Sequence, residues 1–442
     1  MCIIDKRKSE RMSVAFANTR KDYKGDATTS YDSSSIKANK LFANLLLFFI
    51  CGNIALDFVA GLFGVSYLSQ FARIVFFAFM LYVELRLDRK GFCLLFVALT
   101  LVAVQSVLSQ MLSEEGMTAS SLFYDLAIGI KFLMFFAVYF TAKSLIRCNA
   151  LTVDQIKKAI AIAAIYVPII YLGSVALGLG GSSYWDGSGY KSVFSSLNSV
   201  NVSMIVLFAY SAEAFLFQKK TYWLIPMGLN LISLLMLGTK AGYLFAFAIL
   251  FYYLMIPPET RLRNAVIGMF ILFGLAFVFS HVSALSEMLY KVSSRQTYLF
   301  ENRTLIDYLT SGRTWMLAEA IDLFASQGNP LSLIFGGGYY CFHHDLASLS
   351  GYLMTASVRP IEFDWADLFF SYGAIVTVLV YSFLLVKLLD SWRARKENRF
   401  QFIALFGMII FSCVGGHVLF EAISSVTLGS VLACINGDGD EQ

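Results

Sequence analysis

The chain has 442 residues, of which 58% are hydrophobic and only 14% are charged. An ordinary soluble domain carries roughly 25% charged residues, so this composition excludes a soluble globular protein and predicts an integral membrane protein. The formal net charge of +4 gives no reason to expect nucleic acid as a partner, whereas the lipid bilayer is an expected partner of so apolar a chain.

Residues 1–40 are polar and basic, and we expect them to form a disordered cytoplasmic tail. They lack the apolar core and the small-residue cleavage site of a signal peptide. The first spanning helix is therefore expected to serve as an uncleaved anchor. Cysteines lie mostly in apolar segments without metal or disulfide spacing. A short acidic tail occupies residues 436–442.

Apolar segments long enough to cross a bilayer follow the tail one after another. We predict an all-α polytopic membrane protein with about twelve transmembrane helices, each of roughly 20 apolar residues. Helices 1–9 lie within residues 41–281 and helices 10–12 within residues 366–435. The expected spans are residues 41–63, 68–86, 91–110, 121–142, 159–180, 198–218, 221–237, 240–257, 264–281, 366–389, 401–416 and 418–435.

Basic residues favour alternate loops of this series. The loops expected inside hold Arg86, Arg89, Lys90, Lys143, Arg147, Lys157, Lys158, Lys219, Lys220, Arg261, Arg263, Arg393, Arg395, Lys396 and Arg399. The short loops expected outside hold only Lys191 and Lys240. Cytoplasmic loops of membrane proteins carry the excess of lysine and arginine, so both termini are predicted to be cytoplasmic.

Residues 282–363 form the one large loop, on the extracytoplasmic side, because they are too polar to span. Helical stretches are expected near 286–308 and 313–327, followed by a glycine turn at Gly336-Gly337-Gly338. A long loop in a compact protein is more often functional than a plain connector. No internal repeat relates the two halves of the chain, which argues against transporters built from repeats.

Charged residues within the predicted spans gather in the outer half of the membrane. They are Asp57, Arg73, Asp125, Lys131 and Lys240, with His417 and Glu421 at the outer turn after Gly415-Gly416. Charges inside a bilayer are costly, and they line cavities or pair with one another. Two interpretations stay open: a cation-rich cavity that opens outward, or ion pairs of Asp57 with Arg73 and of Asp125 with Lys131 that only orient helices.

The large loop adds a second set of chemically useful side chains. Its members are Arg295, Arg303, Arg313, Arg359, His343, His344, Asp345, Glu362, Asp364 and Asp367. Arginine suits bidentate phosphate binding, and a carboxylate or histidine beside it can act as a general base. Glycosyl transfer from a lipid diphosphate needs this combination. The same residues could instead be interface charges or helix N-terminal charges. Adjacent histidines give poor metal geometry, so we predict no metal.

Several short segments carry a resemblance to a known family. They are Ile130-Lys131-Phe132-Leu133, the outer segment from Gly189 to Asn198, Gly238-Thr239-Lys240-Ala241-Gly242, Ser311-Gly312-Arg313-Thr314-Trp315, Asn329-Pro330-Leu331, Phe335-Gly336-Gly337-Gly338, Glu362-Phe363-Asp364-Trp365-Ala366-Asp367 and Tyr372-Gly373. In this order, with one large outer loop before the last helices, the chain resembles the O-antigen polymerase and O-antigen ligase superfamily of polysaccharide enzymes.

The resemblance implies a GT-C-like membrane glycosyltransferase that takes glycans from undecaprenyl diphosphate, without a metal or other cofactor. The diphosphate contacts are then expected among Arg313, Lys240, Arg73, Lys131 and Arg359. The general base is expected among His343, His344, Glu362, Asp364 and Asp367. The sequence departs from the family in having lysine at 240, where many relatives place arginine, and in lacking the arginine, ten residues, glycine motif of some polymerases.

The resulting prediction is a Wzy-type polymerase in a bacterial cytoplasmic membrane. It would join undecaprenyl-diphosphate-linked oligosaccharide repeat units on the outer face, in the synthesis of O-antigen, capsule or exopolysaccharide. Dependence on a chain-length regulator protein stays open. One alternative is a ligase that attaches finished glycan to lipid A core or to protein. Another is a flippase for lipid-linked oligosaccharide, or a different transporter.

Overall fold

The structure is a computed structural model that describes residues 33–112, 118–184, 186–255, 283–328, 330–349, 358–395 and 397–435, with a few positions between 262 and 281. These ranges are helical apart from one short antiparallel pair, β1 (Gly181–Ser182) with β2 (Tyr190–Ser192). The all-α class predicted from the sequence is confirmed for the part of the chain that is described.

Among the described residues, seven helices are long and apolar enough to cross a membrane. They are α2 (Ser33–Leu62), α3 (Ser66–Leu87), α4 (Arg89–Leu112), α5 (Ala119–Arg147), α6 (Val153–Ala176), α7 (Leu197–Ala212) with its π-helical continuation η1 (Glu213–Phe217), and α16 (Asp364–Arg393). Shorter apolar helices are α8 (Leu224–Leu237), preceded by the 3-10 turn η2 (Thr221–Trp223), α9 (Lys240–Met255), α17 (Arg399–Val414) and α18 (Ala422–Ala433).

These helices overlap the predicted spans, with two differences: α18 covers only Ala422–Ala433 of the predicted span 418–435, and the first helix starts earlier than predicted. Helix α2 begins at Ser33, so residues 33–40 belong to a helix and not to the predicted disordered tail. Extending a helix already fixed by its apolar part adds one hydrogen bond for each residue ordered, which lets polar residues join it. The rest of the tail, residues 436–442 and most of the predicted span 264–281 lie outside the described residues.

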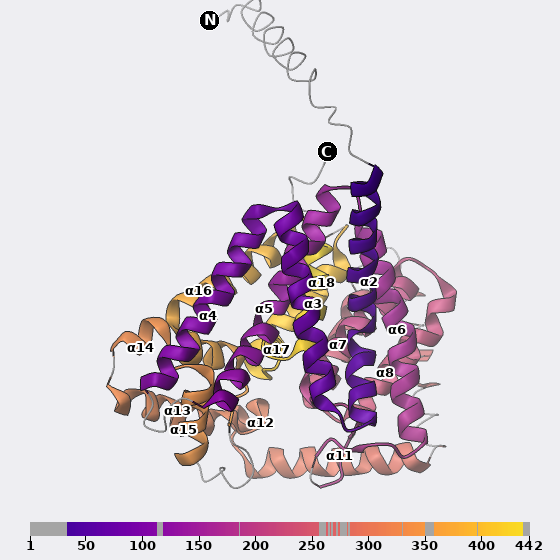
Figure 1. The fold of residues 1–442 in the computed structure, drawn as a ribbon. Coiled ribbons are helices and arrows are strands. Elements are labelled where there is room, and N and C mark those ends of the chain that lie inside the picture. The colour runs from indigo at the N-terminus through magenta and orange to yellow at the C-terminus, as the bar shows by residue number, and fades with distance from the viewer. Residues whose placement is uncertain are drawn as a thin grey trace, which may run out of the picture.

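The large loop is helical in its described parts. It contains α11 (Ser283–Asn302), α12 (Leu305–Thr310), α13 (Arg313–Gln327), α14 (Pro330–Phe335) and α15 (Tyr339–Leu349). Figure 1 shows α11 lying across one end of the helix bundle, with α12, α13 and α15 gathered at that same end. We call it the loop end. The helices predicted near 286–308 and 313–327 are thus present, the first being divided into α11 and α12.

The turns that are rich in basic residues lie at the opposite end of the bundle. Arg147 at the end of α5 pairs with Asp88, between α3 and α4, at 2.8 Å. Lys143 Nζ donates to the carbonyl oxygen of Ile435, just beyond α18, at 2.9 Å. Gln401 at the start of α17 donates to the carbonyl oxygen of Cys434 at 3.1 Å. Turns far apart in sequence therefore meet at one end, which we call the basic end.

The helices differ in how much of their surface the protein covers. Residues of α7 and α18 are buried almost throughout, and these helices form the centre of the bundle with α5. Helix α4, in contrast, exposes Leu94, Phe96, Val97, Leu101 and Val104. An apolar side chain that faces outward suits a hydrocarbon environment and not water, so the exposed faces support a membrane location.

Helix α16 is interrupted near its start, at Gly373, where φ is 83° and ψ is 176°. The break leaves the carbonyl oxygens of Phe370 and Ser371 without their helical donors. The N–H groups of Gly337 and Gly338 supply the missing bonds, at 2.8 and 3.1 Å. The glycine turn predicted from the sequence therefore docks onto the break in α16, and this contact positions the start of α15.

Candidate functional site

The charged residues at the loop end form an alternating series, which we call the charge chain. It runs Lys131, Glu421, His417, Glu362, Arg313. Lys131 Nζ lies 3.6 Å from Glu421 Oε2. The ring of His417 follows, with Nδ1 at 4.0 Å from Glu421 Oε1 and Nε2 at 3.5 Å from Glu362 Oε1. Arg313 closes the series through Nε, at 2.9 Å from Glu362 Oε2, and through Nη2 to the same oxygen.

Four separate parts of the fold supply these side chains. Lys131 comes from α5, His417 and Glu421 from the turn between α17 and α18, Glu362 from the segment before α16, and Arg313 from the first position of α13. The charge chain therefore links the bundle core with the helices of the large loop. The packing of these four parts against one another holds the charged side chains in contact.

Asp364 holds the turn that carries His417. Its Oδ1 accepts the N–H of His417 at 2.7 Å. Its Oδ2 accepts the N–H groups of Val418 and Leu419 at 2.8 and 3.0 Å. The side chain is completely buried. The sequence offered Asp364 as a candidate base. In the structure its carboxylate instead holds the backbone of the turn beside the charge chain.

Asp367 and His343 form a second buried support. Asp367 Oδ1 accepts the N–H of Ile361 at 2.8 Å, and Oδ2 accepts the N–H of Glu362 at 3.1 Å. Asp367 Oδ1 also lies 2.8 Å from His343 Nε2, and His343 Nδ1 lies 2.8 Å from the carbonyl oxygen of Tyr339. His343 is completely buried, and both its ring nitrogens contact groups of the protein interior, not solvent.

Glu362 is the candidate carboxylate that reaches open space, since its side chain is 34% exposed. Burial would raise its pKa, but the hydrogen bond and charge of His417 and the charge of Arg313 outweigh burial and lower the pKa to about 2. Burial alone would lower the pKa of His417, yet Glu362, Glu421 and Asp364 raise it to about 9. Near neutral pH the two groups are therefore an ionised pair.

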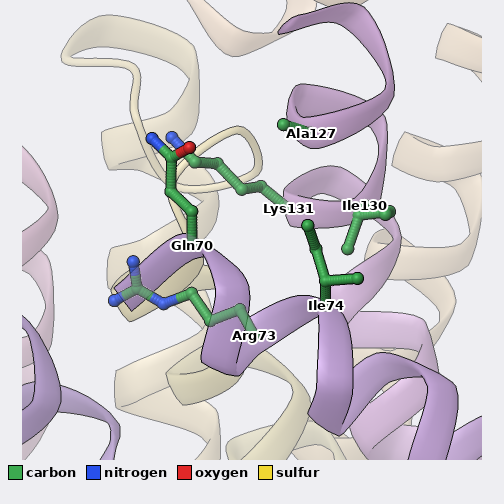
Figure 2. Close-up of a pocket in the computed structure, with 6 residues that line it drawn as sticks. All are labelled: Gln70, Arg73, Ile74, Ala127, Ile130 and Lys131. Carbon is green, nitrogen blue, oxygen red and sulfur yellow. The ribbon is translucent and has the colours of Figure 1, made fainter. Parts of the chain in front are cut away.

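A second cation lies beside Lys131. Arg73 Nη2 is 3.4 Å from Asp57 Oδ1, and Arg73 also donates to the side chains of Asn53 and Ser69. A small pocket is lined by Gln70, Arg73, Ile74, Ala127, Ile130 and Lys131. Figure 2 shows the polar ends of Gln70, Arg73 and Lys131 turned to the same side, away from Ile74 and Ile130.

The two ion pairs considered from the sequence have different outcomes. Asp57 pairs with Arg73, as expected. The expected pairing of Asp125 with Lys131 is wrong, because Asp125 accepts from Gln110 Nε2 at 2.9 Å and from the N–H of Tyr340 at 2.6 Å. Lys131 is thereby directed to Glu421. Asp57 also accepts from the hydroxyl of Ser195 at 3.0 Å, so this ion pair ties α2 and α3 to the outer segment.

Three other predicted residues lie outside the charge chain. Lys240 Nζ donates to the carbonyl oxygen of Tyr308 in α12 and stands 4.0 Å from the centre of its ring. The Arg359 guanidinium lies 4.4 Å from the Trp315 ring centre. The ring of His344 stacks on Tyr340 at 5.4 Å. Lys240 and Arg359 thus pack on aromatic rings of the loop helices.

A larger cleft of about 780 Å³ opens between α4 and the loop helices α13 to α15. Its lining includes Gln105, Leu108 and Ser109 of α4, and Phe342 and Asp345 of α15. Phe342 and His343 are neighbours on α15, and His343 faces Asp367. Helix α15 thus contributes Phe342 to this cleft and His343 to the buried support at Asp367.

Sequence reasoning assigned no role to His417 or Glu421, although it placed both at the outer turn. A usable signal was present: two titratable residues four apart, directly after Gly415-Gly416 and between apolar helices. What the site can do chemically follows from its charges. Guanidinium and ammonium groups bind oxyanions, and an accessible carboxylate can accept a proton.

The residues and their geometry are the basis for a functional proposal. Comparison with protein-family models, with curated proteins and with solved structures finds no match for this chain.

Proposed function

We propose that this chain is a membrane glycosyltransferase of Wzy type, which polymerises oligosaccharide repeat units carried on undecaprenyl diphosphate. The observation that carries the proposal is the charge chain at the loop end. It presents Arg313 and Lys131 as cations for a diphosphate, and between them the partly exposed carboxylate of Glu362 for an acceptor hydroxyl. Glycosyl transfer from a lipid diphosphate needs both kinds of group within one site.

The proposed topology has twelve crossings with both termini in the cytoplasm and the loop end outside a bacterial cytoplasmic membrane. Its support is the gathering of Arg86, Arg147, Lys219 and Arg393 in turns of the basic end, since cytoplasmic loops carry the excess of basic residues. The loop helices then face the compartment in which lipid-linked repeat units are joined.

In the proposed reaction, a hydroxyl of the acceptor unit attacks the anomeric carbon of the donor glycan. The bond from that carbon to the diphosphate oxygen breaks, and undecaprenyl diphosphate leaves with the electron pair. The hydroxyl proton passes to the carboxylate of Glu362, the partly exposed carboxylate of the charge chain. Arg313 and Lys131, with Arg73 beside Lys131, stabilise the negative charge that develops on the diphosphate.

Arg313→Ala is expected to abolish long polymer while single repeat units persist. Removal of one group that stabilises transition-state charge costs about 10²–10³ in rate. The measurement is gel analysis of surface glycan in the host strain carrying the variant. Arg393→Ala, at an exposed arginine of the basic end, is the matched control and should give wild-type chain lengths. Normal chain lengths in Arg313→Ala would refute the role of Arg313.

Deletion of the whole gene separates the proposal from its nearest alternative. A polymerase deletion leaves single repeat units on the surface, whereas a ligase deletion leaves long polymer on the lipid carrier. Glycan that is unchanged in both pools would refute the glycosyltransferase proposal as a whole.

A further inference from the structure

Every nitrogen of the Arg313 guanidinium is engaged by the protein. Nε and Nη2 both donate to Oε2 of Glu362, and Nη1 donates to the carbonyl oxygen of Thr310 at 3.2 Å. The Nε–Nη2 edge is one that binds a phosphate side-on through two parallel hydrogen bonds. Glu362 is the more exposed partner, at 34% against 12% for the Arg313 side chain. Its carboxylate therefore covers the guanidinium on the open side.

The same carboxylate also reaches a second cation. Its Oε1 lies 3.5 Å from His417 Nε2 while Oε2 is held by Arg313. An O–C–O group that bridges two cations has the charge and the general shape of the O–P–O edge of a phosphate. Arg313 and His417 therefore hold this carboxylate as a pair of cations would hold a phosphate.

We infer that Glu362 is a resident substitute for the ligand, and that the diphosphate of the donor displaces it from Arg313 and His417. This inference rests on the proposed function for the identity of the diphosphate. Displacement exchanges one anion for another between the same two cations, so neither cation is left without a negatively charged partner while the ligand enters.

The surroundings allow the side chain to move while its backbone stays fixed. The N–H of Glu362 is held by Asp367 Oδ2 at 3.1 Å. Its backbone has φ of +67°, a conformation that a non-glycine residue keeps only when the surroundings enforce it. His417 is fixed by the bond from its N–H to Asp364. A rotation of the Glu362 side chain is thus enough to open the site.

Displacement has a catalytic consequence. His417 and Arg313 lower the pKa of Glu362 to about 2, against the effect of burial, and a carboxylate of so low a pKa is a weak base. Once a diphosphate has taken these cations, the pKa rises toward its ordinary range and the carboxylate becomes a better proton acceptor. Binding of the donor would therefore activate the base that the acceptor hydroxyl needs.

The test is binding of inorganic pyrophosphate to the full chain in phosphatidylcholine nanodiscs, measured by isothermal titration calorimetry. Glu362→Gln removes the competing charge and should tighten binding at least about tenfold, which corresponds to about 1.4 kcal/mol. The control is Glu287→Gln on α11, where the glutamate is exposed and paired with Lys291 at 2.8 Å; it should leave the affinity unchanged. Equal or weaker binding by Glu362→Gln would overturn the inference.

A double variant locates the effect. Arg313→Ala in the Glu362→Gln background should abolish the gain in affinity, and a gain that persists would overturn the assignment to Arg313. Thermal unfolding of each variant shows that the protein is folded when it is titrated. A lipid headgroup is the other possible source of phosphate, and it is tested by repeating the titration of the single variant Glu362→Gln in nanodiscs that contain phosphatidylglycerol. If pyrophosphate binds more weakly there than in phosphatidylcholine nanodiscs, the lipid competes for the site. That result would overturn the diphosphate assignment and give the site to a lipid headgroup.

The outcomes are separate from those that test the proposed function, because pyrophosphate binding needs no glycan transfer. If gene deletion leaves the surface glycan unchanged and Glu362→Gln binds pyrophosphate more tightly, the polymerase proposal is rejected and the inference that Glu362 is displaced stands. Short glycan on deletion, together with unchanged binding, would keep the polymerase and reject the displacement.

Discussion

At the scale of single residues, two aspartates one helical turn apart have different partners. Asp364 binds the N–H groups of the turn at His417, and Asp367 binds those of Ile361 and Glu362. Each oxygen of both carboxylates accepts at least one hydrogen bond. Together they fix the backbone on both sides of the contact between Glu362 and His417, so they are positioning residues of the candidate site.

Asp364→Asn is expected to destabilise the protein by about 2 kcal/mol or more. One oxygen becomes an NH₂ group that faces N–H donors, and a buried donor left without an acceptor costs about 1–3 kcal/mol. Thermal unfolding in detergent should show a Tm lower by several degrees. Asp322→Asn, on an exposed position of α13, makes the same chemical change and should leave Tm within a degree or so of wild type. Equal Tm values for both variants would contradict the role of Asp364.

At the scale of secondary structure elements, the break in α16 determines how the loop helices dock. A Cβ atom built at Gly373 would lie 2.0 Å from the carbonyl oxygen of Ile334, and one at Gly336 would lie 2.3 Å from the carbonyl carbon of Ser371. The two backbones meet this closely because neither residue has a side chain. Both also have positive φ, 83° and 75°, which glycine adopts without strain.

Gly373→Ala is therefore expected to cost more than about 2 kcal/mol, since a backbone with positive φ and ψ near 180° is essentially confined to glycine and costs another residue about 1–3 kcal/mol, and the contact with Ile334 adds to it. The control is Gly228→Ala in α8, where a Cβ atom would meet nothing within 4 Å. That change should be neutral, or stabilise by up to about 1 kcal/mol through helix propensity. The measurement is the Tm of both variants in the same detergent. A Gly373→Ala protein as stable as Gly228→Ala would show that the close approach is not needed.

At the scale of the whole molecule, charge and architecture are arranged along one axis. The basic turns meet at one end of the bundle. The loop helices, of which α13 supplies Arg313 of the charge chain, gather at the other end (Figure 1). In the proposed topology the basic end is cytoplasmic, because cytoplasmic loops carry the excess of lysine and arginine, and the candidate site faces outward.

Single cysteines in a background without native cysteines test this orientation. Lys291→Cys on α11 should react with an impermeant maleimide on intact spheroplasts. Arg393→Cys at the basic end should react only after the membrane is permeabilised. Both positions are exposed in the structure, so burial does not limit labelling. The reverse pattern would contradict the proposed topology and place the charge chain in the cytoplasm.

Hydropathy and charge along the chain are sufficient to predict the helices and the grouping of basic residues in alternate turns. Runs of apolar residues and loop charges are local properties, and a bilayer acts on them directly. One boundary that hydropathy predicts wrongly is the start of α2, because the helix continues into polar residues that hydropathy assigns to the tail. Lys131, Arg313 and Glu362 of the charge chain were also among the candidates predicted from the sequence, whereas His417 and Glu421 were noticed at the outer turn and given no role.

Which of those residues act together depends on contacts between distant parts of the chain. Lys131 pairs with Glu421 and not with nearby Asp125, and Arg313 reaches Glu362, because helices distant in sequence bring these charges within contact. Among the carboxylate candidates, Asp364 and Asp367 became buried supports and Glu362 stayed accessible, although the three lie within six positions of one another. Burial and the choice of partner depend on what packs against a side chain, and no local pattern of residues contains that information.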